Sequence, residues 1–110
     1  AVASPECDVL RQDLNQAVTD GIGDGYLCVS YTERFGGNGT HEACEDYLGA
    51  MMELMLTVRE LDDRGCYYRI APSDAKQIAR IYCQYLAAQK YSKDWPGRGD
   101  FFSVLWRKWL

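Results

Sequence analysis

Long apolar runs and an excess of basic residues are both missing from this chain of 110 residues. Its most apolar stretch, residues 48–58, is interrupted by Glu53 and is shorter than the roughly 20 residues of a transmembrane helix. We therefore expect no membrane span. The 12 lysines and arginines are outnumbered by 16 carboxylates, which gives a net charge of −4. Because an acidic protein repels phosphate, nucleic acid is not an expected partner either.

Histidine is almost missing too, since His41 is the only one in the chain. A nucleophile paired with a histidine base would have to use this residue. Cys44 follows His41 at helical spacing, but two ligands do not make a metal site, and no C-x-x-C pair occurs. No carboxylate pair lies in an evident apolar setting. We therefore expect a protein that is not an enzyme, with no catalytic residue, no metal and no cofactor.

What the chain does contain is the composition of one globular domain, which we expect to span residues 1–110. It is 47% hydrophobic and 25% charged. The clearest pattern lies between residues 41 and 61, where apolar residues recur at spacings of three and four. This pattern predicts the longest helix of the fold, with Gly65 as its C-cap. Its apolar face comprises Ala43, Cys44, Tyr47, Leu48, Met51, Leu54, Met55, Val58 and Leu61.

Weaker patterns predict the other helices. Ser4 and Pro5 have the residue types of a helix start, and residues 20–25, with three glycines, should end that first helix. Residues 26–35 are ambiguous between helix and strand. A further helix should open at Pro72 with Ser73 as its N-cap, and a last one should follow Asp100. The whole is predicted to be all-α, a small bundle of four or five helices. The apolar face of the first helix comprises Leu10, Leu14, Ala17 and Val18. That of the helix from Pro72 comprises Ala75, Ile78, Ala79, Ile81, Tyr82, Tyr85 and Leu86. That of the last helix comprises Phe101, Phe102, Leu105, Trp106 and Trp109.

Five widely separated cysteines favour structural disulfides and an oxidising compartment. A reduced cytosolic protein with buried thiols is the alternative. The odd number leaves one thiol over, and spacing does not choose among the pairings. Ala1-Val2-Ala3 has the small-x-small form of a signal-peptidase site, so we expect a mature secreted or periplasmic protein. The alternative is that this N-terminal stretch is rich in alanine by chance and is not a signal-peptidase site. The cysteines are Cys7, Cys28, Cys44, Cys66 and Cys83.

Two stretches together resemble the Rap/Tai immunity proteins of type VI secretion systems. The first is Cys-Glu-Asp-Tyr-Leu-Gly-Ala at 44–50, with Cys28 upstream. The second consists of Cys66, then Pro72, then Gln-Ile at 77–78 and Tyr-Leu at 85–86. The resemblance covers about half of the chain. Two family glycines are replaced here by Asp46 and Ala50, and the closing Phe-Pro-Cys of the family has no counterpart.

This resemblance implies a small helical periplasmic protein, often a homodimer, that blocks the active site of a cognate peptidoglycan amidase. The inhibitor would act by steric occlusion and perform no chemistry itself. An acidic protein suits a basic, wall-seeking enzyme, because complementary charge raises association rates. The resemblance favours a Cys28–Cys44 disulfide and leaves Cys7 or Cys83 as the partner of Cys66.

The partner-binding surface is predicted just after the long helix, at Glu60, Asp62, Asp63, Tyr67 and Tyr68. Carboxylates at a helix C-terminus oppose the helix dipole, so their position is locally unfavourable and permits a functional role. The two tyrosines are adjacent, and exposed aromatic residues often dominate interface energies. A solvated helix end with one structural tyrosine is the alternative. A secreted interaction module or effector that binds a host or cell-surface protein is the alternative function.

Overall fold

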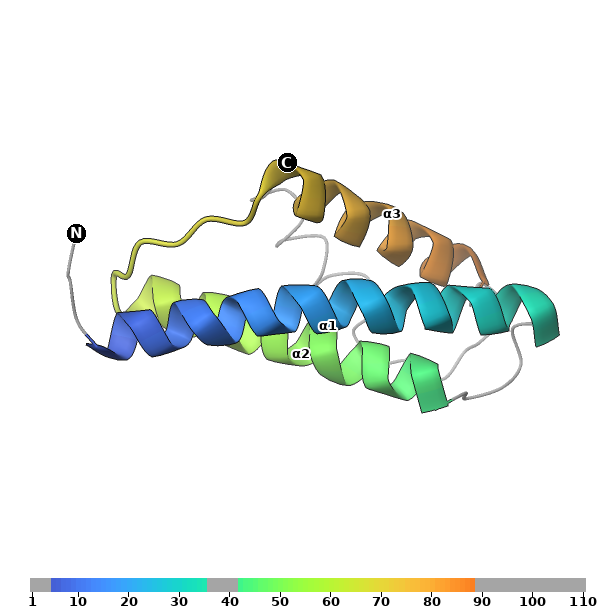
Figure 1. Ribbon diagram of the computed structural model, residues 1–110, viewed down its shortest axis with the longest axis horizontal. Helices are drawn as coiled ribbons and strands as arrows, with labels where there is room; N and C mark the ends of the chain where they lie inside the picture. Colours follow the sequence, from blue (N-terminus) through green and yellow to red (C-terminus); the bar gives the residue numbers. More distant parts are fainter. Residues whose placement is uncertain (1–4, 36–41, 89–110) are drawn as a thin grey trace.

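Three helices and no strand make up the part of the chain that the computed structural model describes, residues 5–35 and 42–88 (Figure 1). The long helix α1 (Pro5–Phe35) lies at the centre and packs against both α2 (Glu42–Asp63) and α3 (Pro72–Ala88). α2 runs antiparallel to α1 along most of its length. The all-α class is confirmed, but four or five helices are not found in these ranges. The predicted helix after Asp100 lies outside them.

α1 corrects the prediction of a break at residues 20–25, because the helix runs without interruption through all three glycines. The reason is tertiary packing. A Cβ atom on Gly25 would lie 2.5 Å from Cγ2 of Ile81 in α3 and 3.0 Å from Cε1 of Tyr47 in α2. Side chains of α2 and α3 therefore meet α1 at Gly25, in a space that only a residue without a side chain leaves free. Residues 26–35, left open between helix and strand, belong to the same helix.

α2 confirms the predicted apolar face, since eight of its nine residues are buried and Leu48 is half-buried. The helix is not the longest, however: α1 has 31 residues and α2 has 22. Gly65 ends it as predicted, with a φ of 68°. The amide of Cys66 donates to the carbonyl of Leu61 and that of Gly65 to the carbonyl of Asp62, the two bonds of a Schellman motif. No helix of the described ranges is both long and apolar enough to cross a membrane.

α3 begins at Pro72, one residue before Ser73, which was the predicted N-cap. The amide of Ala75 donates to the carbonyl of Ala71, so Ala71 is the N-cap, Pro72 the first helical residue, and the predicted cap, Ser73, is already helical. The ring of Tyr85 meets the ring of Tyr47 edge to face, with centroids 5.4 Å apart. Burial raises the pKa of Tyr47, whose hydroxyl has no hydrogen-bond partner among the described residues. This tyrosine therefore contributes to the core mainly through its ring.

Two disulfides join α1 to the chain that follows it. Cys28–Cys44 confirms the pair that the resemblance favours, and Cys7–Cys66 closes the other end of the antiparallel pair. Of the two partners left open for Cys66, Cys83 is wrong, because its thiol is free and exposed. Ile81, two residues earlier, faces the core, so the helical period turns Cys83 away from α1. Cys7 takes its place because the end of α2 lies beside the start of α1.

Candidate partner-binding surface

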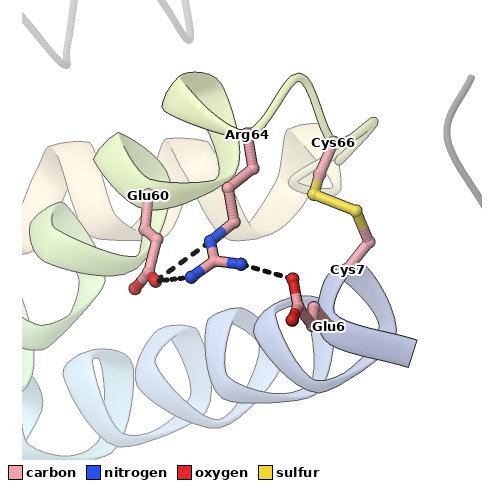
Figure 2. Close-up of polar contacts among 5 residues, drawn as sticks. All are labelled: Glu6, Cys7, Glu60, Arg64 and Cys66. Atoms are coloured by element: carbon pink, nitrogen blue, oxygen red, sulfur yellow. Dashed lines mark hydrogen bonds and ion pairs between the residues drawn. A yellow bond between two sulfur atoms is a disulfide. The ribbon is translucent and has the colours of Figure 1, made fainter. Parts of the chain in front are cut away.

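The predicted surface lies at the end of the molecule where α1 starts and α2 stops. The Cys7–Cys66 disulfide joins the two helices there, with Cα atoms 5.6 Å apart (Figure 2). Both cysteines are buried, at 2% and 6% exposure. Nη1 of Arg11 adds a hydrogen bond of 2.9 Å to the carbonyl oxygen of Tyr67. The chain just after α2 is therefore fixed to α1 by a covalent bond and by a side-chain hydrogen bond.

Arg64 bridges the two helices at this end. Its guanidinium pairs with Glu6 at the start of α1 and, at 3.1 Å, with Glu60 one turn earlier in α2 (Figure 2). All three side chains are well exposed, at 45% for Arg64, 72% for Glu6 and 49% for Glu60. Exposed ion pairs contribute at most about 1 kcal/mol each, so this bridge does little for stability. Its main effect is to hold the three charged groups in a defined arrangement.

The structure gives the five predicted residues different surroundings. Glu60 is held by Arg64, whereas Asp63 is exposed and has no ion-pair partner among the described residues. Asp62 is exposed as well, and its carbonyl takes part in the helix cap. The two tyrosines separate: Tyr67 is 69% exposed, and Tyr68 is half-buried against the core. Tyr67 is thus a strongly exposed aromatic residue of this set, and Asp63 is an exposed carboxylate outside the Arg64 bridge.

Sequence reasoning missed Glu6 and Arg64, which complete this surface. Glu60 and Arg64 are four residues apart on a helix, and that spacing alone predicts their pairing. Glu6 carries no such signal. It is 58 residues away from Arg64 in sequence, and the packing of α1 on α2, closed here by Cys7–Cys66, brings it there.

A second group of carboxylates lies nearer the opposite end of the helix pair. Asp24 of α1 lies close enough to Asp46 of α2 and to Asp20 for their negative charges to disfavour ionisation of its carboxyl group. Partial burial, followed by these two charges, raises the pKa of Asp24 above its usual value. Since the described residues contain fourteen carboxylates and seven lysines and arginines, acidic character extends over the helical body as a whole.

Potential metal ligands do not form a group of three or more in the described ranges. Cys83 stands alone on the exposed side of α3, and His41 lies outside the described residues. What the described surface offers is an arrangement of carboxylates, one arginine and an exposed tyrosine.

Comparisons with protein-family models, with curated proteins and with solved structures found no match to this chain. The resemblance to the type VI immunity proteins therefore rests on the motif residues of 28–86 alone.

Proposed function

We propose that this protein acts by binding another protein, and that the partner is a cell-wall amidase whose active site it covers. The observation that carries the proposal is the rigid end of the molecule at Cys7–Cys66. There the exposed ring of Tyr67 and the exposed carboxylate of Asp63 are presented on a chain segment that is fixed to α1. A preorganised surface loses little conformational entropy on binding, so more of its contact energy appears as affinity.

The chemistry of the surface supports a basic partner. With twice as many carboxylates as basic residues, the helical body attracts a cationic protein, and the attraction speeds the encounter. Two formed disulfides are compatible with a protein that works outside the cytoplasm. The periplasm, an amidase as the partner and a homodimer as the assembly state are parts of this proposal that come from the family resemblance.

Co-expression tests the proposal directly. The protein is produced in the periplasm together with an amidase encoded beside its gene, and both growth and co-elution are measured. We expect the wild type to restore growth and to co-elute with the enzyme. If the wild type fails to protect against any amidase encoded beside it, the immunity function is wrong.

Paired variants then locate the surface. Tyr67→Ala should weaken binding by about 30-fold, the effect of losing about 2 kcal/mol at an interface anchor. Tyr26→Ala removes another exposed tyrosine, on α1 away from this end, and is the matched control. Asp63→Lys should slow association, and Glu33→Lys makes the same charge change near the end of α1. Equal losses in the test and control variants would remove this end of the molecule from the interface.

A further inference from the structure

A cleft of about 340 Å³ opens between the first two turns of α1 and the last turn of α2. Its lining residues within the described ranges are Pro5, Glu6, Val9, Leu10, Glu60 and Arg64. The cleft thus combines three apolar side chains with the whole Glu6–Arg64–Glu60 bridge of Figure 2. None of its apolar residues belongs to the surface predicted from the sequence.

The apolar part of the cleft is open to solvent. Val9 is 55% exposed although it lies only two residues after Cys7 of the buried Cys7–Cys66 disulfide. A single exposed aliphatic residue is ordinary on a protein surface, but one that lines a cleft gains free energy when a partner covers it.

The charged rim is not neutral. Glu6 and Glu60 share the single guanidinium of Arg64, and each uses one carboxylate oxygen for it. The second oxygen of each carboxylate has no ion-pair partner among the described residues. The rim therefore keeps one net negative charge and two free acceptor positions, beside an apolar floor.

We propose that this cleft receives a lysine or arginine side chain of the protein partner. The methylene groups of that side chain pack on Val9 and Leu10, and its charged end binds the free carboxylate oxygens of Glu6 and Glu60. Long basic side chains have this amphipathic character, with an apolar stem and a charged tip. The inference rests on the proposed function only in taking the partner to be a protein. The cleft then supplies an anchor beside Tyr67 and Asp63.

The test uses the full-length protein and a designed amphipathic helical peptide of leucine and lysine as the probe, with a peptide that has glutamate in place of lysine as its control. Binding is measured by fluorescence anisotropy of the labelled peptide. We expect Val9→Lys to weaken binding of the lysine peptide by about tenfold or more, because it removes the apolar contact and adds a like charge. Leu27→Lys makes the same charge change at an exposed leucine far along α1 and should have a much smaller effect. Circular dichroism confirms that each variant is folded.

Three results would overturn the proposal. One is undetectable binding of the lysine peptide at millimolar concentration, and another is an equal loss of binding in the Leu27 control. The third comes from the tryptophans, all of which lie in residues 89–110. If Val9→Lys shifts their emission before any peptide is added, this chain's own segment occupies the cleft. The two proposals can fail separately. If the lysine peptide does not bind, the wild type can still protect growth. If the wild type does not protect growth, the peptide can still bind.

Discussion

Replacing Gly25 by alanine should destabilise the fold, although alanine is the better helix former. In an exposed helix this exchange stabilises by about 1 kcal/mol. At Gly25 the new methyl group would lie 2.5 Å from Cγ2 of Ile81 and 3.0 Å from the ring of Tyr47. Both neighbours are fully buried, at 0% and 1% exposure. Cγ2 is fixed to the branched Cβ of a stiff side chain, so it has no flexible end that moves away.

Overpacking of this kind costs about 1–3 kcal/mol, which exceeds the gain in helix propensity. Gly23→Ala is the matched control, because nothing lies within 4 Å of the Cβ that it adds to the same helix. We expect the control to stabilise by up to about 1 kcal/mol and Gly25→Ala to destabilise by up to about 2 kcal/mol. The resulting gap of about 1–3 kcal/mol corresponds to a difference in Tm on the order of 10 °C.

Urea unfolding followed by circular dichroism, with the disulfides intact, measures both variants. A double-mutant cycle with Ile81→Ala identifies the cause, because removing Cγ2 should recover about 1–3 kcal/mol in the Gly25→Ala background. If Gly25→Ala stabilises the protein as much as Gly23→Ala does, the close approach of the three helices is wrong.

Three further predictions concern the core, the thiols and pH. Met51→Asp should cost several kcal/mol and unfold the protein, while Met52→Asp should melt near the wild type; similar melting of the two would contradict the burial of Met51. Mass spectrometry after alkylation of the unreduced protein should find one labelled cysteine, Cys83, and five labelled cysteines would exclude both disulfides. Because the pKa of Asp24 is raised in the fold, its charged form opposes folding, and stability declines as pH rises from below 3.8 through the folded pKa. Asp24→Asn should therefore raise Tm at pH 7 and lose that advantage near pH 3, and an equal effect at both pH values would show that charge is not the cause.

The sequence predicted the elements whose signal is local. The apolar face of α2 and the positive φ at Gly65 follow from residue types within a few turns of each other. The continuity of α1 across its glycines was not predictable in this way. Local propensity favours a break there, and the contacts of Gly25 with Tyr47 and Ile81, 22 and 56 residues away, oppose it.

The same distinction between local signals and long-range contacts applies to the candidate surface. The sequence predicted both tyrosines in the binding surface, with one structural tyrosine as the alternative; Tyr67 is exposed, whereas Tyr68 is half-buried against the core. Glu6 and Val9 carry no signal for this surface, since nothing in residues 5–10 indicates that they meet the end of α2. The pairing of Cys7 with Cys66 would have indicated it, but spacing alone does not choose Cys7 over Cys83.

The two disulfides also determine how the protein responds to mechanical force. Cys7–Cys66 is a covalent shortcut, so tension applied between residues 5 and 88 passes from one cysteine directly to the other. Helices α1 and α2 lie almost wholly inside the bridged stretch and carry none of the load. Only residues 66–88 extend, by no more than about 3.3–3.6 Å for each residue. A partner or membrane that pulls on the chain would thus detach α3 and leave the surface at the Cys7–Cys66 end joined.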